Sequence, residues 1–285
     1  MFFESLTPAL AASLLPVRDE NTDKMGFGKL LCVCGSHNMP GAAVLSIGGA
    51  LRAGVGLCTI ASVESVCRAV TAVFPGAVLN ILPESKDGGI NPLASQKIAA
   101  SLSHFSAVLI GCGVGITGGG RVMLRTLLKE CTKPLIIDAD GLNLLCEDTS
   151  LLKDAKCPIV LTPHQRELER LLEASGMPDA QTFAREYGVT VVAKGARTEI
   201  HGTKNYVLDA HNTALAKGGS GDILAGIIAS LCAQGADTVS AAAASVYIHS
   251  KAGALASGML GVRSVLVTDI LDKIGVAFNE IEGKI

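Results

Sequence analysis

Tryptophan is absent from this 285-residue chain, and aromatic residues make up only 4% of it. Since hydrophobic residues still reach 49%, small and branched apolar side chains must fill the core. Such a core is typical of helices layered on a buried parallel sheet. One α/β domain can reach this length, so we expect residues 1–285 to form a single domain with no second domain fused to it.

Long blocks of like charge are also absent, and the formal net charge is −2. This excludes a basic nucleic-acid-binding stripe and an acidic tail. Despite a mean hydropathy of +0.43, no run of 18 apolar residues occurs, and no membrane span is expected. Residues 1–5 lack the basic region of a signal peptide, and we expect a cytoplasmic protein.

Paired cysteine motifs are missing, although the chain has nine cysteines. Neither C-x-x-C nor C-x-x-C-H occurs, which argues against a zinc ribbon and against covalently attached haem. The closest two, Cys32 and Cys34, lie in an apolar run. We interpret the cysteines as small buried hydrophobic residues in a reducing cytosol.

Short apolar runs alternate with helical patterns along most of the chain. The runs that have the length and branched composition of buried strands are residues 30–34, 107–111, 134–138, 158–162 and 190–194. Segments of helical composition or spacing lie between them, including residues 42–51, 120–130 and 165–174. This alternation predicts a mostly parallel central sheet with helices on both faces, a three-layer α/β/α fold.

The pattern changes in the last third of the chain. Residues 198–200 and 206–208 flank a short polar segment, which predicts a hairpin. After Gly221, apolar residues at helical spacing predict a helix that begins near Ile223, and the Ala-rich residues 239–256 predict a second, buried helix. In parallel sheets ligands bind at the carboxyl ends of the strands, where this sequence places glycines and polar residues.

A glycine-rich segment precedes the first of these two helices. It consists of Lys217, Gly218, Gly219, Ser220 and Gly221, followed by Asp222. Glycines let backbone N–H groups converge on a ligand, and a helix N-terminus favours an anion, so the segment suits a phosphoryl group. It is not a Walker A motif, and Gly113-Val114-Gly115 does not complete a dinucleotide-binding fingerprint. Asp222 has two interpretations here, a helix N-cap or a general base.

The order of the motifs resembles a known family. The segments that carry the resemblance are residues 15–18, 24–29, 35–36, 40–43, 51–57, 138–143 (D-A-D-G-L-N), 162–164 (T-P-H), 194–198 and 212–226. The glycine segment with Asp222 is similar to the anion hole and catalytic aspartate of the ribokinase-like superfamily. Within that superfamily the chain most resembles the ADP/ATP-dependent NAD(P)H-hydrate dehydratases.

The resemblance implies an activity and a set of site residues. The family dehydrates NADHX or NADPHX to NADH or NADPH at the expense of ADP or ATP, and we expect ADP as the donor. By this resemblance Asp222 is the catalytic base. The residues implied in binding the hydrated dinucleotide are Ala42, Gly113, Asn143, His164 and Asp222. Those implied in binding the adenine nucleotide are Lys194, Gly195, Ala196, Arg197, Thr198, Asn212, Lys217, Gly218, Gly219, Ser220 and Gly221.

The resemblance also implies magnesium, an oligomer and a partner enzyme. Residues 164–167 are similar to the N-x-x-E magnesium motif of the superfamily with His164 in place of Asn, so Glu167 is expected to support Mg²⁺ indirectly. Relatives are often homotetramers, and a separate NAD(P)HX epimerase would supply the reactive epimer. The local sequence leaves other interpretations open: His164 as a helix cap, Glu167 as a charge that complements the helix dipole, Asn143 as a turn cap and His249 as a core histidine outside the site.

Two departures from the family pattern and two rival functions accompany this interpretation. Gln165 and Arg166 stand where Pro-Gly is common, and residues 37–39 replace a segment that often contains Tyr. The nearest rival is a kinase for a hydroxymethyl vitamin precursor, which the D-A-D-G-L-N string disfavours. The other is a non-catalytic nucleotide-binding subunit, which would not need Asp222 as a base.

Overall fold

The computed structural model describes residues 2–19 and 21–283, so Met1 and the outermost C-terminal residues of the predicted domain lie outside the description. Ten strands form one sheet in the order β1-β10-β9-β8-β7-β6-β5-β2-β3-β4. The strands are β1 (Glu4–Ser5), β2 (Lys29–Val33), β3 (Leu57–Ser62), β4 (Val78–Ile81), β5 (Ala107–Ile110), β6 (Leu135–Ile137), β7 (Ile159–Leu161), β8 (Thr190–Ala193), β9 (Arg197–His201) and β10 (Tyr206–Asp209).

Eleven α-helices and three short 3₁₀ segments accompany the described strands. They are α1 (Pro8–Ser13), α2 (Pro40–Arg52), α3 (Glu64–Val73), α4 (Ala94–Ser101), η1 (Leu102–His104), α5 (Gly118–Glu130), α6 (Asp140–Leu145), η2 (Thr149–Leu152), α7 (Gln165–Ser175), α8 (Ala180–Tyr187), η3 (Thr213–Leu215), α9 (Ser220–Ala233), α10 (Thr238–Leu260) and α11 (Val267–Ile281). None of the helices in this part of the chain combines the length and apolar character that crossing a bilayer requires.

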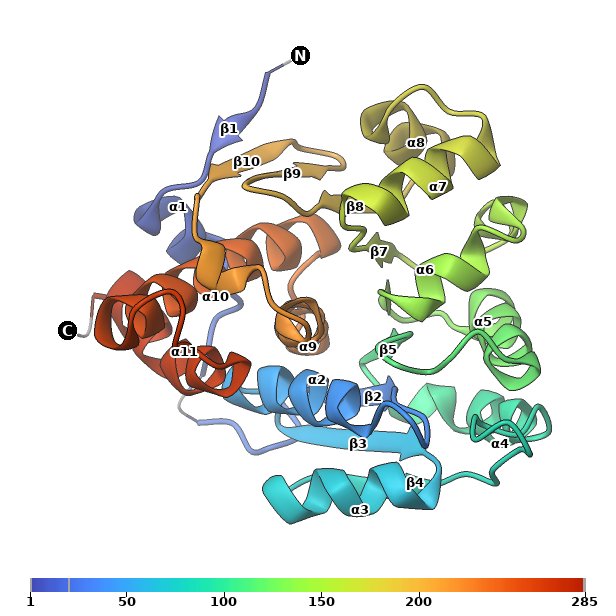
Figure 1. Ribbon diagram of the computed structural model, residues 1–285. Helices are drawn as coiled ribbons and strands as arrows, with labels where there is room; N and C mark the ends of the chain where they lie inside the picture. The colour runs from blue at the N-terminus through green and yellow to red at the C-terminus, as the bar shows by residue number, and fades with distance from the viewer. Residues whose placement is uncertain (1, 20, 284–285) are drawn as a thin grey trace.

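Helices cover both faces of the sheet. In Figure 1, α2, α9, α10 and α11 lie on one side of the strands and α4 to α8 on the other. The strands from β4 through β2 and β5 to β8 are parallel to their neighbours, whereas β9 is antiparallel to both β8 and β10. The predicted mostly parallel three-layer fold and the predicted hairpin are therefore confirmed. The five predicted strands correspond to β2, β5, β6, β7 and β8.

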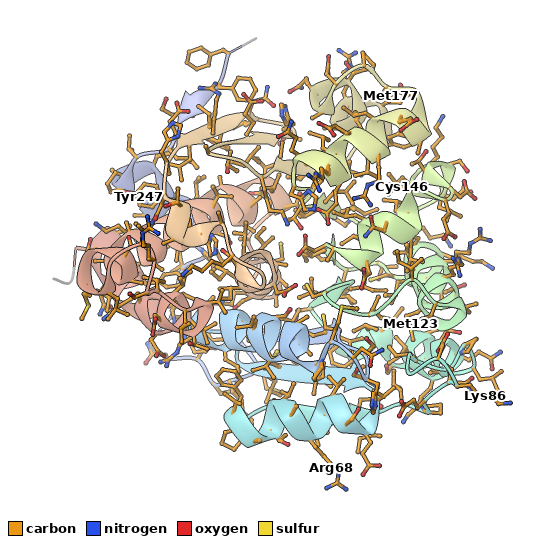
Figure 2. All side chains as sticks on the ribbon, viewed as in Figure 1. Arg68, Lys86, Met123, Cys146, Met177 and Tyr247 are labelled. Carbon is orange, nitrogen blue, oxygen red and sulfur yellow. The ribbon has the colours of Figure 1, made fainter. Side chains whose placement is uncertain are left out.

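The core lies between the sheet and each helix layer. All four residues of β5 are completely buried, and so are Leu30 to Val33 of β2. A fully buried Leu, Val or Ile side chain contributes roughly 1.5–3 kcal/mol relative to an exposed one, which is why the central strands consist of such residues. Figure 2 shows side chains filling both layers: Met123 of α5 is fully buried, whereas Arg68 of α3 extends into solvent.

The register of the parallel strands aligns their carboxyl ends. Val33 of β2 pairs with Ile110 of β5, Ile110 with Ile137 of β6, and Ile137 with Leu161 of β7. The residues that follow these strands therefore lie along one edge of the sheet. A bridge between His164 and Lys194 brings the end of β8 to the same edge. The N-terminal end of α9 also lies there, because α9 packs on β5 and β6.

Candidate active site

A cleft of about 680 Å³ opens at this edge, between the ends of β6 to β8 and the start of α9. It collects thirteen of the predicted site residues: His164, Glu167, Lys194, Gly195, Ala196, Thr198, Asn212, Lys217, Gly218, Gly219, Ser220, Gly221 and Asp222. Apolar side chains such as Leu215 and Leu224 line it as well. A cleft of this size with an apolar lining and a few convergent polar groups is typical of a small-molecule site.

Helix α9 begins at Ser220, three residues before the predicted start at Ile223, with Gly219 as its N-cap. The first intrahelical bond runs from Ile223 N to Gly219 O at 3.3 Å, so the amides of Gly221 and Asp222 precede the helical ladder. The interpretation of Asp222 as the N-cap is thus wrong. Asp222 occupies the third helical position and lines the cleft, where the dipole of α9 favours an anion.

Gly219 has a backbone φ of +94°, and a Cβ built on it would lie 2.3 Å from Leu45 Cδ1. We therefore expect Gly219→Ala to destabilise the protein by about 1–3 kcal/mol and to weaken nucleotide binding, because the loop must shift. The matched control is Gly218→Ala, since a Cβ at Gly218 meets nothing within 4 Å. Chemical denaturation of both variants tests this prediction, and equal midpoints would contradict it.

A buried ion pair lies beside the start of α9. Lys194 Nζ donates to Asp138 Oδ1 at 2.8 Å, and Thr162 Oγ1 donates to the same oxygen at 2.7 Å. Although burial opposes the charged form of Lys194, the Asp138 carboxylate raises its pKa above the ordinary value. A Cβ built on Gly221 would lie only 3.1 Å from Lys194 Nζ, so the ammonium group faces the glycine segment.

The Asp222 carboxyl group is unusually basic. Burial and the nearby Asp138 carboxylate raise the pKa of Asp222 to about 7. A hydrogen bond with Cys112 and the charge of Lys194 act in the opposite direction. A group with this pKa can accept a proton from a substrate hydroxyl near neutral pH, as a general base must.

His164 and Glu167 form a capping box at the start of α7. His164 Nδ1 accepts from Arg166 N at 3.1 Å, and Glu167 Oε2 accepts from His164 N at 2.8 Å. His164 therefore does cap a helix, as one interpretation of the sequence had it, and it also lines the cleft. Burial raises the pKa of Glu167, whose carboxylate remains at the cleft wall.

His249 is a cleft residue that the sequence-based interpretation excluded. Its Nε2 lies 3.1 Å from Ser220 Oγ, and both side chains are buried. Burial and the charge of Lys194 lower the pKa of His249 to about 4, so the imidazole is neutral. The Ala-rich sequence of α10 gives no sign of which face meets Ser220, and no local signal could have placed His249 there.

Four predicted residues do not line the cleft. Ala42 and Gly113 lie against each other at the starts of α2 and of the loop after β5, since a Cβ on Gly113 would be 2.8 Å from Ala42 Cβ. Asn143 Oδ1 accepts from Arg170 Nη1, and the Arg197 guanidinium pairs with Glu199 and Asp209. Lys217 lines the cleft, but its ammonium group donates to the carbonyls of Arg263 and Val265.

The D-A-D-G-L-N string contains a strained residue. Ala139, directly after β6, has φ +50° and ψ −120°, and it is the one non-glycine residue with positive φ in the described ranges. Asp138 precedes it in the ion pair, and Asp140 Oδ2 accepts from Gly115 N at 2.9 Å. Such conformations cost of order 1–3 kcal/mol and concentrate at functional sites. The turn directs the Asp138 side chain toward Lys194, after β8, and the Asp140 side chain toward Gly115, after β5.

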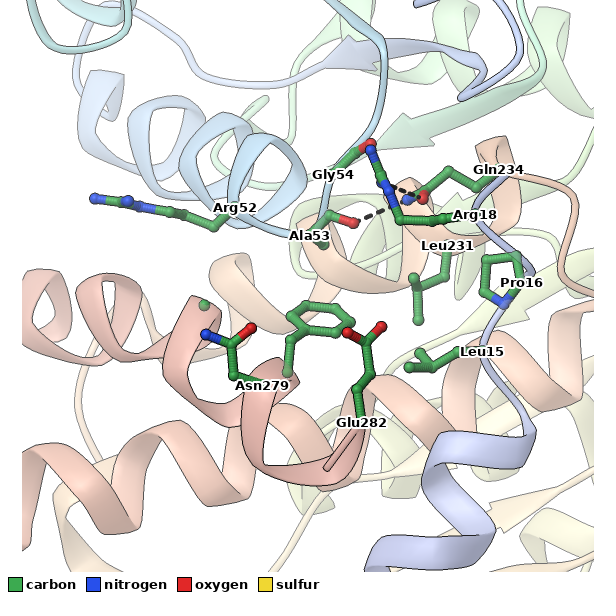
Figure 3. A pocket seen from close by; sticks show the side chains of 12 residues that line it. Leu15, Pro16, Arg18, Arg52, Ala53, Gly54, Leu231, Gln234, Asn279 and Glu282 are labelled. Carbon is green, nitrogen blue, oxygen red and sulfur yellow. Dashed lines mark hydrogen bonds between the residues drawn. The ribbon is translucent and has the colours of Figure 1, made fainter. Parts of the chain in front are cut away.

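A second pocket, of about 240 Å³, lies at the far ends of α2 and α9 (Figure 3). Its Arg18 guanidinium donates to Gly54 O at 2.9 Å and to Gln234 Oε1 at 3.0 Å, and it stacks over Phe27. Gln234 in turn donates to Ala53 O. These hydrogen bonds link the C-terminal ends of α2 and α9. Because the polar groups bind one another, we assign this pocket a structural role.

Comparison with known proteins shows which protein family the chain matches. The sequence profile described as NAD(P)H-hydrate dehydratase matches residues 30–275. An ADP-dependent (S)-NAD(P)H-hydrate dehydratase of Listeria monocytogenes is 31% identical over 95% of this chain and 95% of its own length. The bifunctional NAD(P)H-hydrate repair enzyme of Moorella thermoacetica is 33% identical over 98% of this chain, which spans about half (54%) of that relative.

A solved structure extends the likeness to the whole fold. The ADP/ATP-dependent NAD(P)H-hydrate dehydratase of Bacillus subtilis, co-crystallized with ATP and Mg²⁺, superposes with a TM-score of 0.82 at 27% identity. The superposition covers 99% of this chain and 99% of the other. The fold is therefore the ribokinase-like fold that the sequence resemblance implied.

Proposed function

Because the chain belongs to the NAD(P)H-hydrate dehydratase family, we propose that it restores NADH and NADPH from their hydrates, NADHX and NADPHX, by consuming an adenine nucleotide. The observation that carries this proposal is the position of Asp222. A carboxyl group whose pKa is raised to about 7 lies on the first turn of α9, in one cleft with the glycine segment and Lys194. This arrangement suits proton removal next to phosphoryl transfer.

The proposed reaction has two stages. Asp222 accepts the proton of the ring hydroxyl, and the hydroxyl oxygen attacks the terminal phosphorus of the nucleotide, so that the P–O bond to the nucleotide breaks. The phosphorylated hydrate then loses phosphate as the lone pair of the ring nitrogen forms an iminium ion, and loss of a proton from the adjacent ring carbon restores the dihydropyridine. With ADP as donor, NADHX and ADP give NADH, AMP and phosphate.

The glycine segment and Lys194 stabilise the negative charge on the oxygens of the transferred phosphoryl group. The amides of Gly221 and Asp222 precede the ladder of α9, and the Lys194 ammonium group lies beside Gly221. In many enzymes, hydrogen-bond donors that are already oriented toward the developing charge supply most of the rate enhancement over the uncatalysed reaction. Phosphorylation converts a poor leaving group, hydroxide, into a good one.

Mg²⁺ is expected with the nucleotide, where it would neutralise phosphate charge. The residues fit this ion through water: one oxygen of Glu167 is committed to His164 N, and the buried carboxylate remains at the cleft wall. Carboxylates that hold Mg²⁺ commonly do so with several waters in place. Glu167→Gln is expected to raise the Mg²⁺ concentration needed for half-maximal rate, and an unchanged metal dependence would refute this role.

The remaining cleft residues suit an adenine nucleotide. Thr198 Oγ1 donates to Gly195 O at 3.0 Å and fixes the turn after β8, while Asn212 caps η3, which also lines the cleft. Leu215 and Leu224 offer apolar contacts. We favour ADP over ATP as donor, a choice supported by the name of the Listeria relative. Ala42, Gly113, Asn143 and His164 are proposed to contact the hydrated dinucleotide.

The rival functions predict different products. A kinase for a hydroxymethyl vitamin precursor would release a stable phosphorylated product, and a nucleotide-binding subunit would release none. Membership of the dehydratase family disfavours both. Asp222 has a raised pKa and lies in a cleft, a combination that is typical of a catalytic group and that nucleotide binding alone does not require.

The deciding experiment follows NADH absorbance after addition of the protein to purified NADHX and Mg²⁺, with ADP, ATP or no nucleotide. We expect recovery that depends on nucleotide, with one phosphate released for each NADH formed. Absence of recovery from a folded protein that still binds nucleotide would refute the proposed function.

The pH dependence of kcat/KM should report the Asp222 carboxyl group in the free enzyme. The base acts when deprotonated, so kcat/KM is expected to fall about tenfold for each unit below pH 7 and to level off above it. The groups that set this pKa are Asp138 and Cys34, which raise it after burial, and Cys112 and Lys194, which lower it. A flat profile between pH 5.5 and about 8 would contradict the assignment.

Three features of the protein in the cell complete the proposal. We propose a homotetramer, with which the apolar composition of the chain is compatible, and a separate epimerase that converts the unreactive hydrate epimer. We also propose a cytoplasmic location, which the nine free thiols support. Sedimentation of the purified protein tests the first of these.

A further inference from the structure

The proposed base belongs to a group of three side chains that are all of metal-ligand type. Cys112 Sγ and carboxylate oxygens of Asp138 and Asp222 all lie within 4.8 Å of one another. Within residues 2–19 and 21–283, no other three side chains of ligand type converge this closely. We propose that these three side chains bind Zn²⁺, and that bound zinc inhibits the enzyme by occupying Asp222.

The spacing suits a small tetrahedral ion. Zinc bonds of about 2.3 Å to sulfur and 2.0 Å to oxygen place neighbouring ligand atoms roughly 3.5 Å apart. Cys112 Sγ is already 3.7 Å from Asp138 Oδ2. Asp222 is half-buried and lines the cleft, so its side chain can close the remaining gap. Because Asp138 and Asp222 line the cleft, water from the cleft would fill the fourth position.

Charge balance also indicates a dication. Among the described residues, the cation beside Asp138 and Asp222 is Lys194, which pairs with Oδ1 of Asp138 and leaves Oδ2 directed at Cys112. A coordinated thiol loses its proton outright. Three anionic ligands and the Lys194 ammonium group then balance the two charges of zinc, as a buried site requires.

The thiol gives the site its selectivity. Mg²⁺ prefers oxygen ligands and gains little from sulfur, whereas Zn²⁺ binds thiolate strongly. Cys112 is fully buried, its Sγ lies within 4.8 Å of both carboxylates, and Cys34 forms a hydrogen bond with it. Micromolar Zn²⁺ is therefore expected to occupy this site even when millimolar Mg²⁺ is present.

Zinc binding is tested on the full-length protein without substrate, by competition with a chromophoric chelator. We expect one zinc per chain in the wild type and an affinity lower by roughly 100-fold or more in Cys112→Ser. Cys157→Ser is the matched control, since Cys157 is a half-buried thiol that precedes β7 at the opposite edge of the sheet. A second control is His37→Ala, which removes the exposed His37–Glu84 pair and so tests for zinc binding at the surface. This variant should keep the zinc affinity of the wild type.

Co²⁺ provides a direct probe of the ligands. The wild type and Cys157→Ser should show thiolate-to-cobalt charge-transfer absorption, and Cys112→Ser should not. Equal zinc affinity of wild type and Cys112→Ser, or loss of binding in His37→Ala, would overturn the site. If Cys112→Ser does not fold, Asp222→Asn with weakened zinc binding supports it, and Asp222→Asn with unchanged binding refutes it.

Inhibition rests on the proposed function, whereas binding does not. In the NADHX assay, the zinc concentration that halves the rate should match the dissociation constant from the chelator competition. A protein that binds zinc and shows no dehydratase activity would refute the proposed function alone. A protein that is active and insensitive to bound zinc would refute the inhibitory role of this site.

Discussion

Asp222→Asn is expected to lower kcat by about 10³-fold while leaving the dissociation constant of ADP within a factor of a few. Loss of a positioned general base typically costs 10²–10⁴-fold in rate. Asparagine keeps the size of the side chain on the first turn of α9 and cannot accept the proton. Stopped assays of NADH recovery and calorimetric titration with ADP measure the two quantities.

The control for this variant is Asp269→Asn. Asp269 holds the same third position of helix α11, where its carboxylate accepts from Leu266 N at 2.7 Å, and it is not among the cleft residues. It should retain full activity. Undiminished turnover in Asp222→Asn would refute the base assignment, and equal losses in both variants would attribute the effect to helix capping.

Asp222→Asn should also be more stable than the wild type above pH 7. The folded state raises the pKa of Asp222 from its ordinary value to about 7, so the folded chain binds more protons than the unfolded chain between roughly pH 4 and 7. The free energy of unfolding of the wild type therefore falls as pH rises through this window. Asparagine removes that penalty, and greater stability alongside lost turnover would separate a catalytic from a structural role.

Lys194→Met is expected to lower both stability and turnover. It leaves Asp138, which is 1% exposed, as an unpaired buried carboxylate, a change that costs about 3–5 kcal/mol in other proteins. Turnover should fall at least about 10²-fold, since the ammonium group is also proposed to stabilise the transferred phosphoryl group. Urea denaturation and NADH recovery measure the two effects.

A double variant separates the two roles of Lys194. Lys194→Met with Asp138→Asn should regain much of the lost stability, because no buried charge is left alone, and should remain inactive. The surface control is Lys153→Met, which removes an exposed pair with Glu186 at 3.8 Å and should cost less than about 1 kcal/mol. Full activity in the double variant would refute a role for Lys194 in phosphoryl transfer.

The central strands could be predicted from the sequence because burial on both faces demands continuous apolar runs. The edge strand β4 could not, since Val78, Leu79 and Ile81 are all exposed and their pattern carries no information on a core face. Most of the predicted site residues between 194 and 222 line one cleft, and this grouping could also be predicted from the sequence. Their positions follow from strand ends and one helix start, which local sequence does signal.

Other parts of the site depend on tertiary structure alone. The sequence allows Asp222 to be read as the N-cap of the helix, because capping residues normally have polar side chains. In the structure α9 is capped instead by Gly219, which has a left-handed conformation. The contact between His249 and Ser220 joins residues 29 positions apart on two helices, each apolar on nearly all sides. In such helices, periodicity does not identify the face that meets a ligand.

The edge strand β1 shows how late the sheet can be completed during synthesis of the chain. Glu4 pairs with Tyr206, and α1 packs on α10 and α11, so β1 and α1 lack these partners until the residues that form β10, α10 and α11 have been synthesised. Helix α2 waits as well, because it packs chiefly on α9, which carries Asp222. A nascent chain therefore exposes the apolar residues of α1 and α2 until these later elements have been synthesised, and chaperones have a long interval in which to bind them.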